Sequence, residues 1–226
     1  MRYPGGKGKC YQRIINLMPV HSTYIESHLG GGAVMRHKKL AAVNIGIDRD
    51  ANVIERWEAE LPSVCNLVHA DATSFLSGYA FRGDELVYAD PPYVQSTRRS
   101  QGKLYRHDLD EAGHRRLLDV LKSLPCMVMI SGYENPLYRD SLASWRRVSF
   151  VAKTHVDMRE ESVWLNFAPP LQLHDGAHLG STYRERQTVK RRNERWLERL
   201  DRMAPAERSQ LLSLIRDRYT REVSVL

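Results

Sequence analysis

The chain has 226 residues and a formal net charge of +7, which fits one α/β domain with a small appendage and favours a polyanionic partner. Its three cysteines are widely spaced and form no CxxC pair, which argues against a disulfide framework and a cysteine-based zinc site. Because no apolar run has the length of a membrane span and the N-terminus has no apolar signal region, we expect a soluble, cytoplasmic protein without membrane contact.

Residues 1–9 form a glycine- and lysine-rich opening, and the segments after it alternate between strand-like and helical patterns. The predicted strands are a segment ending near Ser27 and residues 43–47, 65–68, 85–88, 127–130, 145–151 and 162–167. The predicted helices are residues 10–18, 33–39, 51–61 and 111–124, with a basic loop at 94–106. This alternation predicts an α/β fold with a mostly parallel, twisted sheet that carries helices on both faces.

The composition changes after Pro169-Pro170, and we divide the chain there into a main domain, 1–170, a linker, 171–182, and a basic extension, 183–226. The extension predicts two helices, roughly 183–203 and 205–221. Its arginines could bind phosphates. Its apolar residues equally fit a homodimer hairpin or a cap on the main domain.

Acidic residues stand at the ends of the predicted strands: Glu26, Asp48, Asp71 and Asp90. In parallel sheets ligands bind beyond the carboxyl ends of the strands, so we expect these four residues to share one site. Two alternatives stay open. Asp48 and Asp71 could be helix N-caps, and Gly30-Gly31-Gly32 could be an ordinary strand-to-helix turn.

The segment Asp90-Pro91-Pro92-Tyr93 follows the apolar residues 85–89 and has the parts needed to act on an exocyclic amine. The Asp90 carboxylate and the Pro91 carbonyl can accept the two amine N–H bonds, and the prolines stiffen the loop. The Tyr93 ring can stack on a base that has left the duplex. The alternative is a turn without a function, because Asp and Pro are common in turns.

With these motifs in order, residues 2–167 resemble the Dam-like, D12 class DNA adenine N6-methyltransferases of phage and prophage type. The resemblance implies a Rossmann-like fold and methyl transfer from S-adenosylmethionine to N6 of a flipped-out adenine in DNA, with no metal required. The catalytic residues that it implies are Asp90, Pro91, Pro92 and Tyr93. The cofactor residues that it implies are Tyr3, Lys7, Glu26, Gly30, Gly32, Asp48, Asp71 and Asp90. Taken alone, Lys7 could equally be a solvated surface charge.

The chain departs from the family pattern in two places. Ser27-His28 stands where the family usually has Pro-Phe, and His28 could stack on the cofactor or be a structural histidine. The stretch between Asp71 and Asp90 is short, whereas well-studied members carry a long target-recognition insert there. Sequence recognition is therefore weak or comes from another part of the chain. Residues 159–166 resemble a late strand common in phage-type members.

The basic loop after Tyr93 is the predicted DNA contact, since arginines with an interleaved tyrosine suit phosphate binding and base stacking. Its residues are Arg98, Arg99, Lys103, Tyr105 and Arg106, followed by His107. A solvated loop is the alternative. For the whole chain, an RNA adenine methyltransferase and a catalytically weak DNA-binding or interaction protein stay open, and cytosine N4 methylation ranks low. The motifs leave open the target sequence and the use in restriction, phage protection or regulation.

Overall fold

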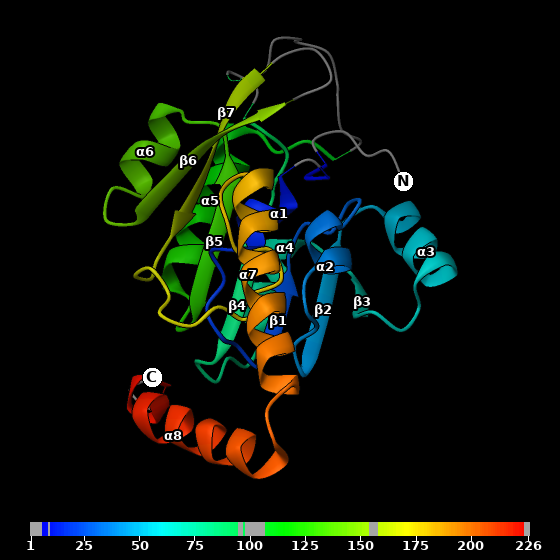
Figure 1. The fold of residues 1–226 in the computed structure, drawn as a ribbon. Helices are drawn as coiled ribbons and strands as arrows, with labels where there is room; N and C mark the ends of the chain where they lie inside the picture. The colour runs from blue at the N-terminus through cyan, green and yellow to red at the C-terminus, as the bar shows by residue number, and fades with distance from the viewer. Residues whose placement is uncertain (1–5, 9, 95–96, 98–106, 154–157, 224–226) are drawn as a thin grey trace.

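The structure, a computed structural model, describes residues 6–8, 10–94, 97, 107–153 and 158–223. A seven-stranded sheet in the order β3-β2-β1-β4-β5-β7-β6 forms its centre (Figure 1). The strands are β1 (Thr23–Glu26), β2 (Val43–Asp48), β3 (Asn66–His69), β4 (Glu85–Ala89), β5 (Met127–Gly132), β6 (Arg146–Lys153) and β7 (Met158–Leu165). β1 to β5 pair in parallel, and β7 runs antiparallel to both β5 and β6. The predicted α/β fold is confirmed.

Helices cover both faces of the sheet. Apolar side chains of α1 (Tyr11–Ile15), α2 (Ala33–His37) and α3 (Ala51–Glu60) pack on one face. Those of α4 (Ala72–Gly78), α5 (Glu111–Ser123) and α6 (Pro136–Ser141) pack on the other. In β4, Leu86 and Tyr88 join the first cluster while Val87 and Ala89 join the second. Coverage on both faces explains why central strands read as continuous apolar runs without alternation.

The sequence prediction missed α4 and α6 and placed the start of β7 too late. Both helices are one or two turns long, and each begins at a capping side chain, Asp71 or Asn135, rather than with an apolar period. β7 begins at Met158 instead of Ser162. Its first residues, Met158 to Glu160, are polar or exposed, because they lie in a hairpin with β6 at the edge of the sheet.

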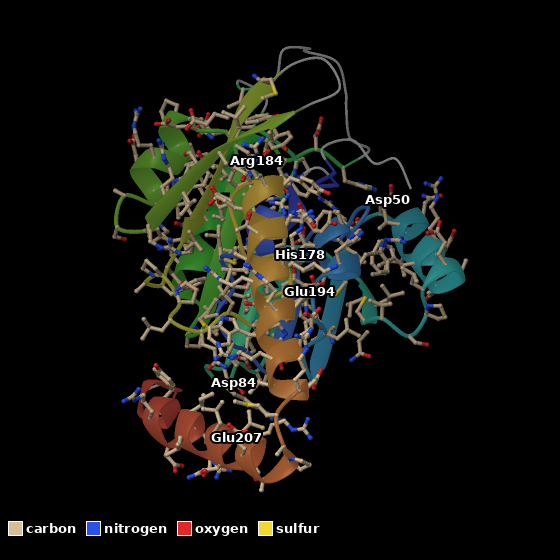
Figure 2. The ribbon with its side chains drawn as sticks, in the orientation of Figure 1. Asp50, Asp84, His178, Arg184, Glu194 and Glu207 are labelled. Carbon is tan, nitrogen blue, oxygen red and sulfur yellow. The ribbon has the colours of Figure 1, made fainter. Side chains whose placement is uncertain are left out.

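The two predicted C-terminal helices are present as α7 (Tyr183–Asp201) and α8 (Pro205–Val223). In Figure 1, α7 crosses in front of the sheet and α8 lies beyond its lower end. Figure 2 shows Arg184 at the start of α7, Glu194 further along it and Glu207 on α8. No residue of α7 is buried. The exposed large apolar side chains of the two helices are Tyr183, Trp196, Leu197, Leu212, Leu214, Ile215 and Tyr219.

The segment predicted as a linker is held against the main domain. Leu173 forms a β-bridge with Pro19, and the His174 and His21 rings stack with centroids 3.8 Å apart. The buried Asp175 carboxylate accepts the backbone N–H of Lys39 at 2.8 Å. These contacts fix the point from which α7 starts.

The strand register brings the predicted acidic residues together. Glu26 at the end of β1 lies opposite Gly46 of β2 and Tyr88 of β4. Asp48 and Asp90 each follow two residues later, at the same edge of the sheet. None of the helices described in the structure is both long and apolar enough to span a bilayer.

Candidate functional site

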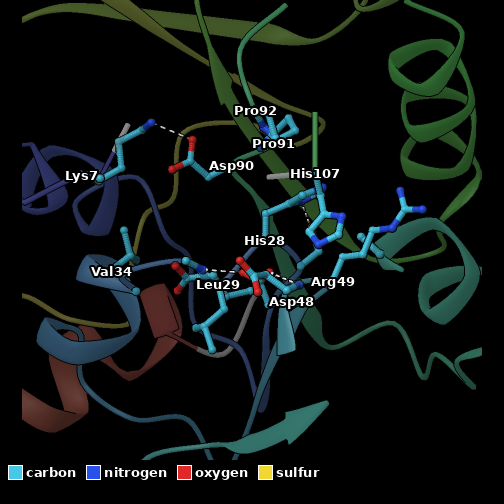
Figure 3. A pocket seen from close by; sticks show the side chains of 18 of the residues that line it. Lys7, His28, Leu29, Val34, Asp48, Arg49, Asp90, Pro91, Pro92 and His107 are labelled. Carbon is cyan, nitrogen blue, oxygen red and sulfur yellow. Dashed lines mark hydrogen bonds and ion pairs between the residues drawn. The ribbon is translucent and has the colours of Figure 1, made fainter. Parts of the chain in front are cut away.

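A pocket lies beyond the carboxyl ends of β1, β2 and β4 (Figure 3). Figure 3 shows Lys7 and Asp90 facing each other, with His28, Asp48, Arg49 and His107 further across the pocket. The predicted site residues that line it are Lys7, Glu26, Gly30, Gly32, Asp48, Asp71, Asp90, Pro91, Pro92 and Tyr93. Tyr3 lies outside the described residues. The predicted convergence of acidic strand ends on one pocket is therefore present.

The glycine turn has a geometry that requires glycine. Gly30 and Gly32 have φ angles of 46° and 54°, a left-handed region that L side chains rarely adopt. A Cβ on Gly32 would lie 2.1 Å from Cζ2 of the fully buried Trp57. The Trp57 indole N–H donates to the Gly30 carbonyl at 3.0 Å. Trp57, which the sequence analysis assigned no role, thus supports the turn from α3.

Asp48 is tied to the glycine turn by its side chain. Its Oδ2 accepts the Gly30 N–H and its Oδ1 accepts the Asp50 N–H, both at 2.8 Å. The helix cap of α3 is Asp50, whose side chain accepts the Asn52 N–H, so the capping alternative is wrong for Asp48. Burial raises the pKa of Asp48, and the two backbone hydrogen bonds oppose that shift.

Glu26 and Asp71 have structural contacts as well as a place in the pocket wall. The buried Glu26 Oε2 accepts the Tyr24 hydroxyl and the Met35 N–H, both at 3.0 Å. Burial raises the pKa of Glu26 to about 8, although both hydrogen bonds favour its charged form. Asp71 caps α4 by accepting the Ser74 N–H at 3.1 Å, so the capping alternative holds for Asp71.

His28 lines the pocket where the family pattern has an aromatic residue. Burial and, to a smaller extent, the nearby His114 lower its pKa to about 4, so the imidazole is neutral at pH 7. Its Nδ1 lies 3.0 Å from the Ser27 hydroxyl oxygen. A neutral imidazole therefore lines the pocket at this position.

Asp90 is held in place through one of its two oxygens. The Lys7 ammonium donates to Oδ1 at 2.6 Å, and the Ser131 hydroxyl donates to the same atom at 2.8 Å. Within the part of the chain that the structure describes, these side-chain hydrogen bonds both use Oδ1, which leaves Oδ2 for a ligand. Lys7 is only 4% exposed, so the alternative of a solvated surface charge is wrong.

Glu161 and Tyr133 belong to this cluster, although the sequence analysis gave them no role. The Lys7 ammonium lies 3.1 Å from Glu161 Oε1 and donates to the Tyr93 hydroxyl at 3.0 Å. That hydroxyl donates to Glu161 Oε2 at 3.2 Å, and the Tyr93 ring stacks on Tyr133 with centroids 4.2 Å apart. The sequence contained one indication that Glu161 could belong to the site: it is a carboxylate next to an apolar strand segment.

Lys7 is the electrostatic centre of the cluster. Burial alone would lower its pKa, but the carboxylates of Asp90 and Glu161 raise the pKa of Lys7 well above its ordinary value. Burial also raises the pKa of Tyr93, so its hydroxyl keeps its proton. The cluster therefore holds one ammonium, two carboxyl groups and a neutral phenol.

The predicted DNA-contact residues Arg98, Arg99, Lys103, Tyr105 and Arg106 lie outside the described residues. His107, which follows them, lines the pocket. The role of the basic loop stays a prediction. Among the described residues, no group of three or more His, Cys, Asp or Glu side chains is placed to hold a metal ion.

Residues 47–156 match the sequence model of the D12 class N6 adenine-specific DNA methyltransferases. This match covers just under half of the chain and includes Asp48, Asp71 and the Asp90-Pro91-Pro92-Tyr93 segment, so the resemblance read from the motifs is confirmed there. This match and the strand order of the sheet together identify the fold as the Rossmann-like methyltransferase fold. No curated protein matches the chain.

Solved structures that match this chain include several methyltransferases. An rRNA methylase from Streptococcus thermophilus is 11% identical with a TM-score of 0.46, and the alignment covers 76% of this chain and 99% of that one. A putative methyltransferase from Streptococcus mutans in complex with SAH is 11% identical with a TM-score of 0.44, covering 69% and 93%. TrmN from Thermus thermophilus is 14% identical with a TM-score of 0.47, covering 70% and 47%.

Proposed function

We propose that this chain, which carries a D12 class methyltransferase domain over residues 47–156, transfers a methyl group from S-adenosylmethionine to N6 of a flipped-out adenine in DNA. The observation that carries the proposal is the arrangement of Asp90. Lys7 and Ser131 fix its Oδ1 at the end of β4, and its Oδ2 remains for a ligand. The pocket that begins at this carboxylate continues to the glycine turn and Asp48.

The pocket residues fit S-adenosylmethionine. The left-handed turn at Gly30 and Gly32 lets backbone approach a ligand without a Cβ in the way. Asp48, oriented by two backbone N–H groups, suits a ribose diol, and Asp71 lies along the same wall. Acidic side chains around the pocket also suit a cationic sulfonium. When bound, this cofactor supplies an electrophilic methyl group.

The chain's own residues would orient and polarise the adenine amine. The amine nitrogen is a weak nucleophile because its lone pair is delocalised into the ring. Asp90 Oδ2 would accept one N–H and the Pro91 carbonyl the other, which favours a tetrahedral nitrogen and stabilises the positive charge that develops there. The Tyr93 ring, which stacks on Tyr133, would hold the base by aromatic contact.

We further propose that DNA approaches through the basic loop with Arg98 and Arg99, and that the C-terminal extension forms a homodimer contact. The exposed apolar side chains Trp196, Leu197 and Leu212 on α7 and α8 support the second part. Sedimentation velocity would test it. We expect a dimer for the wild type and a monomer for Trp196→Asp, and a monomeric wild type would refute this contact.

The function is tested by incubating purified protein with methyl-labelled S-adenosylmethionine and either unmethylated double-stranded DNA or RNA, followed by nucleoside mass spectrometry. We expect N6-methyladenine in DNA. Asp90→Ala should abolish transfer without altering the circular dichroism spectrum. Transfer to RNA alone, or to cytosine, would refute the DNA adenine assignment, and substantial transfer by Asp90→Ala would remove Asp90 from the mechanism.

A further inference from the structure

Glu161 is a buried carboxylate that faces the site from β7, a strand that runs antiparallel to β5. It is 3% exposed, and its two oxygens contact the Lys7 ammonium at 3.1 Å and the Tyr93 hydroxyl at 3.2 Å. A buried carboxylate without compensating partners would cost several kcal/mol of stability, so the pairing with Lys7 is needed to hold it there. Because Glu161 contacts Lys7 and Tyr93, two residues of the candidate site, its position suggests a role in the reaction.

The charges of the cluster do not cancel. A single ammonium, Lys7, lies between two carboxylates, at 2.6 Å from Asp90 and 3.1 Å from Glu161. With Lys7 charged and Tyr93 neutral, the group of four carries one net negative charge. If Glu161 were absent, Lys7 and Asp90 would form a closed ion pair, and Asp90 would be a weaker acceptor for an amine that becomes positive.

We propose that Glu161 is a positioning residue for the methyl-transfer site: it shares the Lys7 ammonium with Asp90 and thereby leaves negative charge on Asp90 for the adenine amine. The same carboxylate accepts the Tyr93 hydroxyl and fixes the ring that Tyr133 backs. Glu161 does not touch the base; it acts through Lys7 and Tyr93. This inference deepens the proposed function and rests on it.

The neighbouring strand residue offers a matched control. Glu160 precedes Glu161 in β7, is exposed and carries the same charge, so Glu160→Gln changes the net charge of the chain without entering the cluster. Glu161→Gln keeps the size of the side chain and an oxygen that accepts hydrogen bonds, but removes its charge. Glu161→Asp restores the charge with a side chain one methylene shorter.

The first measurement does not need activity. Because the pKa of Lys7 lies well above its ordinary value, lysine labelled with ¹³C and ¹⁵N in the full-length protein would report the protonation of Lys7 by NMR from pH 8 up to pH 12, with Lys7→Met assigning the signal. The described groups that face Lys7 are Asp90, Glu161, Tyr93, Tyr88 and Cys10. We expect the titration of Lys7 to move to lower pH in Glu161→Gln and to stay in place in Glu160→Gln. An identical titration in all three proteins would overturn the pairing.

The second measurement separates chemistry from binding. Removing a hydrogen bond between charged groups typically costs a factor of about 10–100, so kcat for DNA adenine methylation should fall by roughly that factor in Glu161→Gln. KM for DNA and the affinity for S-adenosylmethionine should stay within about twofold, since the lost interaction acts in the transition state. Glu161→Asp should recover part of kcat. A fall in KM and kcat alike, or an equal loss in Glu160→Gln, would contradict the proposal.

The two proposals fail in different ways. A wild-type protein that methylates DNA, together with a Glu161→Gln variant of unchanged kcat and unchanged Lys7 titration, refutes only the role of Glu161. A wild-type protein that binds the cofactor but methylates no adenine refutes the proposed function, and the Lys7 titration then still decides whether Glu161 controls the charge of the cluster.

Discussion

Replacement of Gly32 by alanine tests the explanation given for the glycine turn. A non-glycine residue in the left-handed region costs about 1–2 kcal/mol. Its Cβ would also lie 2.1 Å from Cζ2 of Trp57, a fully buried ring that cannot move freely, and overpacking of this kind costs about 1–3 kcal/mol. The reduced freedom of the unfolded chain offsets about 0.4–1 kcal/mol. We therefore expect Gly32→Ala to lower the free energy of unfolding by about 2–4 kcal/mol.

Urea unfolding monitored by circular dichroism measures this change. Gly78→Ala is the matched control, because a Cβ at Gly78 meets nothing within 4 Å and Gly78 has no left-handed φ. We expect the control to have a wild-type or slightly higher midpoint. A Gly32→Ala variant within about 0.5 kcal/mol of wild type, the range of an ordinary surface substitution, would refute the steric argument.

Three further predictions concern the cofactor, pH and DNA. Asp48→Asn should weaken S-adenosylmethionine binding by about tenfold or more in calorimetry, while Asp110→Ala, which removes the cap of α5 outside the pocket lining, should not; unchanged affinity would remove Asp48 from the ribose site. Because the pKa of Glu26 is raised to about 8 in the folded state, its contribution to stability is present below its unfolded pKa near 4.5 and is lost as the pH rises towards 8. Glu26→Gln should therefore lose less stability than wild type between pH 5 and 8 in urea unfolding, and parallel curves would contradict this. Arg98→Ala with Arg99→Ala should flatten the slope of log K for DNA against log salt by about 2, and an unchanged slope would place the DNA contact elsewhere.

The sequence alone predicted the parts of the site that follow strands in the chain. Asp48 and Asp90 were found because each ends a buried apolar segment, and parallel strands bring their carboxyl ends to one edge. The same reasoning predicted the sheet, since central strands covered on both faces leave long apolar runs. Helices α4 and α6 were missed because capping side chains, rather than an apolar period, start them.

Residues that enter the site through tertiary packing could not be found in this way. Trp57 lies in α3, and only the fold reveals that its ring supports Gly30 and Gly32. Glu161 comes from an antiparallel strand inserted between β5 and β6, and no local pattern shows that this insertion brings it to Lys7. The structure was also needed to decide two open alternatives. Burial of Lys7 excludes a solvated surface charge, and the hydrogen bond from the Ser74 N–H shows that Asp71 is a helix cap.

The central claim is that Asp90 and its neighbours direct methyl transfer to adenine N6 in DNA. Expression of the wild type and of Asp90→Ala in a host without DNA methylation, followed by genome-wide mapping of N6-methyladenine, tests it most directly. We expect methylated adenines in DNA from cells with the wild type and background levels with Asp90→Ala, and the flanking sequences would show the target preference. Background levels with a folded, cofactor-binding wild type, or equal methylation with both proteins, would contradict the claim.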